Sequence, residues 1–167
     1  DSSGNEFRLV EFEPCTFLAR FNRKEKNENR IAYCKKAKTV LGLTSDVPSD
    51  FAGIPIFQNM AFWLFPFKDV RKGFEFPALW NFSRELASGN ISEKSFSAAL
   101  ESPGAGLAYL TMICYIVWPE KYLPLDKRTT QYLAARNEQL SSRVGELRKM
   151  DTPFSEYKRF LESTSKF

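Results

Sequence analysis

The segment AGLAYLTMICYIVW, residues 105–118, constrains the fold more than any other part of this sequence. A helix with this sequence is apolar on every side, so it has to be surrounded by other parts of the protein. Its 14 residues are too few to cross a bilayer, which takes about 20 helical residues. Pro119 follows at once and prevents the helix from continuing. The chain is therefore predicted to fold around a buried central helix.

Helical periodicity recurs on both sides of this segment. Apolar residues at helical spacing predict one helix over 27–41 and another over 76–90, each followed or ended by a glycine that suits a helix C-terminus. Ser92, Asp126 and Pro153 are typical first residues of further helices. We therefore expect a compact, mainly α domain of about six or seven helices with little or no sheet. The residues expected to form the apolar stripe of the helix over 27–41 are Ile31, Cys34, Ala37 and Leu41.

The length of 167 residues suits a single domain. The segment CTFLARF, residues 15–21, mixes apolar and β-branched residues, which is typical of a short strand or of a lead-in to the first helix. Glu11 and Glu13 alternate just before it, as on the solvated face of a strand. The expected units are an N-terminal arm or short strand at 1–20, a helical core domain at 21–135, and C-terminal helices at 136–167 that pack on the core.

The composition argues against several classes of protein. The chain has no histidine, and its three cysteines are an odd number without a CxxC pair. A disulfide framework, a Cys/His zinc site and a nucleophile activated by histidine are all poorly supported.

The chain begins with Asp and has no signal sequence, so we interpret it as a piece of a longer cytoplasmic protein. No GxxxxGK[ST] motif occurs, and we expect no catalytic residue, no metal and no cofactor.

Basic residues are concentrated in two parts of the chain. Eight Lys or Arg and two acidic residues lie between Arg20 and Lys38, and seven basic and three acidic residues lie between Lys121 and Lys149. Aromatic residues are interleaved with both clusters. Lysine and arginine neutralise phosphates, and flat rings stack on bases, so this pattern is typical of a nucleic-acid surface. Two solvated helix faces would have the same composition.

An uncharged aromatic stretch, FAGIPIFQNMAFWLFPF, occupies residues 51–67. A domain of this size cannot expose so many neighbouring rings without aggregating, so most of them are expected in the core. Residues 51–55 are interpreted as a turn that fixes the fold. Trp63 is the ring that we expect to remain accessible to a base.

Four stretches carry a recognisable pattern: FNRKEKNENRIAYCKKAKTVLGL, then VPSDFAGIPIFQNMAFWLFPF, then Arg71 with ALWNF, and finally VWPEKYLPLDKRTTQYL. In order and spacing, they resemble the region ahead of the ATPase module in McrB-like proteins, the AAA+ subunits of modification-dependent (5-methylcytosine-type) restriction systems. The resemblance covers about residues 20–135. Ala52 departs from the pattern, which has an acidic residue there, and the ATPase module itself is absent.

The resemblance implies a non-catalytic DNA-binding or specificity domain in a restriction system for antiphage defence. The implied partners are DNA, the AAA+ module of the same chain and a nuclease subunit, with no membrane. A modified base would be flipped into an aromatic pocket. The residues expected to contact DNA phosphates are Arg23, Lys24, Arg30, Lys35, Lys36, Lys127 and Arg128, and those expected to stack on a base are Trp63 and Trp80.

Two other functions are compatible with the sequence. The region could be a protein-interaction or spacer module that couples a reader to the AAA+ ring or to the nuclease partner. A third interpretation is a glycosylase-like enzyme, because Asp126 follows an apolar helix and precedes Lys127-Arg128. The simpler role of Asp126 is to cap the next helix.

Overall fold

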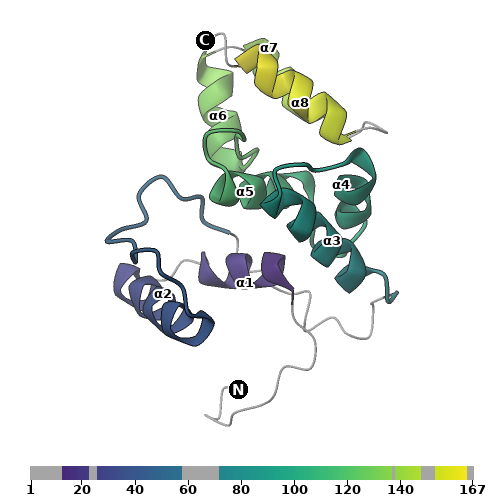
Figure 1. The fold of residues 1–167 in the computed structure, drawn as a ribbon. Helices are drawn as coiled ribbons and strands as arrows, with labels where there is room; N and C mark the ends of the chain where they lie inside the picture. The colour runs from purple at the N-terminus through teal and green to yellow at the C-terminus, as the bar shows by residue number, and fades with distance from the viewer. Residues whose placement is uncertain (1–12, 23–25, 58–71, 137, 148–152, 165–167) are drawn as a thin grey trace.

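The structure is a computed structural model that describes residues 13–22, 26–57, 72–136, 138–147 and 153–164 (Figure 1). The described part is mainly α, as the sequence predicts, and contains eight helices and no strand. The helices are α1 (Pro14–Phe21), α2 (Asn27–Leu41), α3 (Glu75–Ala87), α4 (Glu93–Leu100), α5 (Leu107–Val117), α6 (Lys127–Arg136), α7 (Glu138–Leu147) and α8 (Pro153–Thr164).

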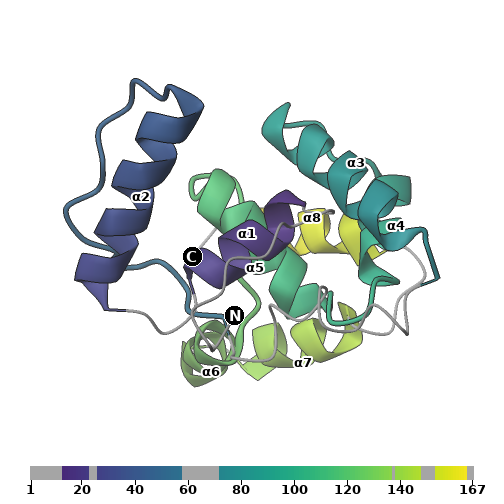
Figure 2. The same cartoon turned by 90° about the horizontal axis from the view of Figure 1, so that it is seen from below.

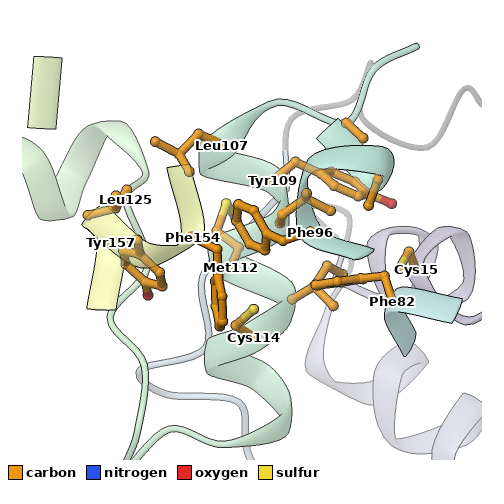
Figure 3. Close-up of a cluster of buried hydrophobic side chains, with 14 of the residues drawn as sticks. Cys15, Phe82, Phe96, Leu107, Tyr109, Met112, Cys114, Leu125, Phe154 and Tyr157 are labelled. Atoms are coloured by element: carbon orange, nitrogen blue, oxygen red, sulfur yellow. The ribbon is translucent and has the colours of Figure 1, made fainter. Parts of the chain in front are cut away.

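Helix α5 is the central helix predicted from the apolar segment. It contacts α1, α3 and α4, and the residues from Tyr109 to Cys114 are all buried (Figure 3). The last residue of the helix, Val117, is exposed. The prediction of a buried central helix is therefore confirmed for Leu107 and for residues 109–114, while Ala108 and the residues of this segment after Cys114 are half-buried or exposed.

An aromatic cluster joins α3, α4 and α8 on one side of the core (Figure 3). The ring of Phe96 packs against the ring of Phe82 at 5.9 Å and against that of Phe154 at 5.0 Å between centroids. All three side chains are buried. Buried aromatic pairs of this kind stabilise beyond the apolar area that they remove from water, so this cluster holds the C-terminal helix on the rest of the domain.

Several helix ends follow local sequence rules. The hydroxyl of Ser92 accepts a hydrogen bond from the backbone N–H of Ser95 at the start of α4 (3.2 Å). Gly42 ends α2 with a φ of 64°, a conformation that favours glycine. Pro153 is the first residue of α8, where its missing N–H costs no hydrogen bond. These three predictions are confirmed.

Helix α1 corrects two expectations. Residues 14–21 are helical, so the interpretation of 15–21 as a strand is wrong. Glu13 is buried rather than solvated, because its Oε1 accepts hydrogen bonds from the N–H and the hydroxyl of Thr16 and thereby caps the helix. Burial raises the pKa of the Glu13 carboxyl despite these hydrogen bonds. Glu11 lies outside the described residues.

Helix α2 lies at the edge of the domain and makes no extensive contact with another described helix (Figures 1 and 2). Its predicted apolar stripe does not reach the core: Ile31, Cys34 and Ala37 are half-buried, and Leu41 is 66% exposed. The buried residue of this helix is Arg30. Periodicity identified the apolar face, but no packed helix covers it.

Candidate nucleic-acid interface

The loop that follows α2 contains a tight turn at Phe51–Ile54. The N–H of Ile54 donates to the carbonyl of Phe51 (3.2 Å), and Gly53 has a φ of 79°. A positive φ at the third position is what a type II turn requires, which explains the glycine. The ring of Phe51 packs edge-on against Phe21 at 5.3 Å. The turn interpreted from the sequence is present, and it ties this loop to α1.

A second loop, Tyr122–Asp126, connects α5 to α6 and is held by two buried side chains. The hydroxyl of Tyr157 donates a hydrogen bond to the carbonyl of Leu123 (2.5 Å) and accepts one from the N–H of the same residue (3.0 Å). The hydroxyl of Thr111 accepts from the N–H of Leu125 (3.0 Å). Loop backbone in a protein interior needs such partners, so α5 and α8 together define the position of this loop.

The two loops meet along one groove, which we call the α6 groove. It has a volume of about 680 Å³ and lies between residues 53–57, the loop residues Leu123 and Pro124, and the first residues of α6. A hollow of about 490 Å³ adjoins it and shares Phe57 with it. The structure therefore brings the GIP stretch and the LPLD stretch of the McrB-like pattern together, although about 70 residues separate them in the sequence.

The charged residues of this groove come from the start of α6. Lys127 and Arg128 are exposed, and Arg128 lines both hollows. The Oδ1 atom of Asp126 accepts a hydrogen bond from the N–H of Thr129 (3.0 Å), so the predicted capping role of Asp126 is confirmed. Asp126 keeps its negative charge as a cap and lines both hollows, so Asp126, Lys127 and Arg128 together give this end of the groove a net charge of +1.

The same helix carries an aromatic and a basic side chain farther along. Tyr132 is 58% exposed, and the guanidinium of Arg136 lies 4.9 Å from the centroid of its ring. Guanidinium groups and exposed rings are the side chains that contact phosphates and unstacked bases. Helix α6 therefore presents phosphate-binding groups at its beginning and a ring with a cation at its end.

The remaining predicted DNA-contacting residues lie elsewhere. Lys35 and Lys36 are exposed on α2. Trp80 is 43% exposed on α3 and is not among the residues that line the α6 groove. Arg23, Lys24 and Trp63 lie outside the described residues.

The position of Arg30 contradicts its predicted role as a phosphate contact. The side chain is only 4% exposed, and its guanidinium lies over the ring of Phe51 at 5.4 Å. Its Nε has no hydrogen-bond partner in the described part of the chain. A guanidinium in this position joins α2 to the Phe51 turn, so we assign Arg30 a structural role.

Sequence reasoning missed the apolar walls of the groove. Ile56 is 44% exposed at its rim, and Tyr115 of α5 contributes a half-buried ring. Ile56 lies inside the uncharged stretch 51–67, in which only the aromatic rings were considered for binding. Tyr115 lies inside the central apolar segment, which was expected to be buried. An exposed residue inside an apolar run cannot be told from its buried neighbours without the contacts.

The described part of the chain does not bring together a set of metal ligands. No three acidic or cysteine side chains come together there as metal ligands would. Cys15 and Cys114 are buried free thiols, and burial raises the pKa of each well above its ordinary value. Helices long and apolar enough to span a membrane are also absent from the described residues.

We expect the substitution Tyr157→Phe to loosen the loop that forms the α6 groove. The variant leaves the N–H and the carbonyl of Leu123 without their side-chain partner, at a cost of about 2 kcal/mol in the free energy of unfolding. Urea denaturation measures this loss, and amide hydrogen exchange should show it first at Leu123 and Leu125. Tyr132→Phe is the matched control, because this hydroxyl is on an exposed side chain. Equal stability of the two variants would contradict the role given to Tyr157.

The chain belongs to the family described as Domain of unknown function (DUF8425), whose model matches residues 1–166. The match covers nearly the whole chain, so the family comprises this helical domain rather than a part of it. Comparison with curated proteins and with solved structures finds no match.

Proposed function

We propose that this chain is a non-catalytic DNA-binding domain of an McrB-like restriction ATPase, and that it contacts duplex DNA through the start of α6. The observation that carries the proposal is the convergence of the two loop stretches of the McrB-like pattern on one groove, with Lys127 and Arg128 exposed at its edge. Two parts of the McrB-like pattern that are far apart in the sequence line one surface, and this supports the functional meaning of the resemblance.

The electrostatics of α6 support this proposal. Lys127, Arg128 and Arg136 are exposed on this helix, while the neighbouring Asp126 is engaged as a cap. Clustered cations release counterions from DNA and supply affinity that does not depend on sequence. The apolar walls at Ile56 and Tyr115 could receive a flipped base, which would require unstacking at a cost of a few kcal/mol.

We expect the double substitution Lys127→Ala and Arg128→Ala to weaken binding to a short duplex about tenfold and to reduce the salt slope by about 2. Fluorescence anisotropy over a series of salt concentrations measures both quantities. The matched control is Arg84→Ala with Lys94→Ala, which removes an exposed arginine and an exposed lysine from α3 and α4. Duplexes with and without 5-methylcytosine should be compared in the same series.

Three results would contradict the proposal. Absence of binding at low salt would exclude a DNA-binding domain and favour the spacer or protein-interaction module. An equal loss in the control variant would show that binding is not localised to α6. Release of a base from the duplex, lost in Asp126→Asn, would show that the domain is an enzyme.

A further inference from the structure

Helix α2 lies at the edge of the domain (Figures 1 and 2), and side chains of α1 and α2 line a second groove between these two helices. This α1–α2 groove has a volume of about 620 Å³ and is lined almost wholly by apolar side chains. Phe17 and Phe21 form its wall on α1, with their rings stacked at 6.4 Å. Tyr33 and Val40 are among the residues that form the opposite wall on α2.

The walls of this groove are unusually exposed for residues of their type. Val40 is 72% exposed, Leu41 66%, Tyr33 43% and Phe17 42%. Single exposed apolar residues are ordinary, but a contiguous group of them marks an interaction site. The groove is separate from the α6 groove, because the two share no lining residue.

The charge around the apolar walls is positive. Helix α2 carries four basic residues and one acidic residue, Glu28, in its first turn. Lys36 lines the groove, and Lys35 is exposed beside it. Asp46 and Asp50, in the loop after the helix, are exposed but do not line it. An occupant would therefore meet apolar walls bordered by lysine.

We propose that the α1–α2 groove binds an amphipathic helix of a partner protein whose apolar face is flanked by acidic residues. A helix is convex and apolar along one stripe, which fits a concave groove between two helices. Complementary charge would orient it and exclude basic partners.

Other occupants fit less well. A second copy of this chain would bring one lysine-bearing helix against another. A bilayer surface is flat and would not fill a concave groove. DNA would contact Lys35 and Lys36 but would not cover the exposed apolar side chains of Val40 and Leu41. Binding of an acidic helix here is independent of DNA binding at α6, so either proposal can fail alone.

The test uses synthetic peptides of about 16 residues, which match the length of α2. The probe has leucines at i, i+3, i+4 and i+7 spacing with flanking glutamates. One control peptide has lysine in place of glutamate, and another has the same composition in scrambled order. Fluorescence anisotropy measures affinity, and amide NMR shifts identify the residues that are contacted.

We expect the acidic peptide to bind with shifts confined to α1 and α2. The substitution Val40→Asp should weaken binding of the acidic peptide about tenfold or more, because the new carboxylate in the apolar wall repels the glutamates of the peptide. Lys36→Glu should reverse the preference, so that the lysine peptide binds better than the glutamate peptide. Lys94→Glu on α4, which is also exposed, should leave both affinities unchanged.

The outcomes that would overturn the proposal are distinct. No binding of the acidic peptide, or equal binding of the acidic and basic peptides, would exclude a helix-binding groove of this charge. Binding to anionic vesicles but not to the peptide would show a membrane surface. A dimer abolished by Val40→Asp would show a second copy as the occupant. Loss of duplex binding in Val40→Asp would assign the groove to DNA.

Discussion

Replacing Phe96 by alanine is expected to lower the free energy of unfolding by about 4 kcal/mol, a large part of the roughly 5–15 kcal/mol that stabilises a typical domain. Phe96 has no exposed surface and contacts the rings of Phe82 and Phe154. The variant leaves a cavity where α3, α4 and α8 meet. The cavity can be filled only if one of these helices moves. Urea denaturation followed by circular dichroism measures the loss.

The control for this variant is Phe17→Ala, which removes the same atoms from a side chain that is 42% exposed on α1. Because the Phe17 side chain is only partly buried, we expect a smaller loss of about 2 kcal/mol. A similar loss in both variants would show that Phe96 is not in a packed core. A change in the slope of the denaturation curve would show instead that the variant altered the denatured state.

Glu93→Gln is expected to lower the free energy of unfolding by about 2 kcal/mol at neutral pH, as much as Tyr157→Phe. The carboxylate of Glu93, at the start of α4, accepts hydrogen bonds from the N–H groups of Phe154 (3.0 Å) and Ser155 (2.7 Å) and from the Ser155 hydroxyl (2.7 Å). These N–H groups belong to the first turn of α8, where no intrahelical acceptor exists. Glu93 therefore caps a helix that lies about 60 residues away in the sequence.

The effect of Glu93→Gln should depend on pH. Partial burial raises the pKa of Glu93, but the hydrogen bonds from Ser155 and Phe154 outweigh burial and lower the pKa below its ordinary value of 4.5. A lowered pKa means that the folded state favours the charged form, so the stabilisation is full above pH 4.5 and is lost as the pH falls through the lowered pKa. The difference in unfolding free energy between the two proteins should therefore shrink in acid.

The control is Glu146→Gln on α7, whose side chain is exposed. We expect it to change stability by less than about 0.5 kcal/mol at any pH. Both variants are tested by measuring denaturation midpoints from about pH 3 to about pH 8. This range extends to either side of the ordinary carboxyl pKa. A pH-independent difference for Glu93→Gln would contradict the capping role of the charged carboxylate.

Local signals in the sequence predicted the elements of this fold well. The central helix followed from an apolar segment that no solvated helix could contain. Ser92, Gly42 and Pro153 marked helix ends because capping and φ preferences act between residues a few positions apart. The strand interpretation of 15–21 was wrong, because Cys15, Thr16 and Ala19 lie on one side of a helix that is buried against the core.

The candidate sites were predicted less well. The basic residues at 127 and 128 were identified from composition, but the groove beside them depends on the meeting of two distant loops. Arg30 was assigned to DNA because it belongs to the basic cluster at 20–38 and to the McrB-like pattern, whereas the structure buries it against Phe51. The α1–α2 groove was not anticipated, because an apolar stripe indicates which face is apolar but not what covers it.

The sequence by itself determined the helical class, the central position of α5 and most helix ends, because these depend on hydrophobicity and on hydrogen bonds between near neighbours. The tertiary structure decided which charges are buried, which loops converge at α6 and which apolar face remains open between α1 and α2. These features depend on contacts between residues far apart in the chain, and such contacts are set by the packing of the whole domain.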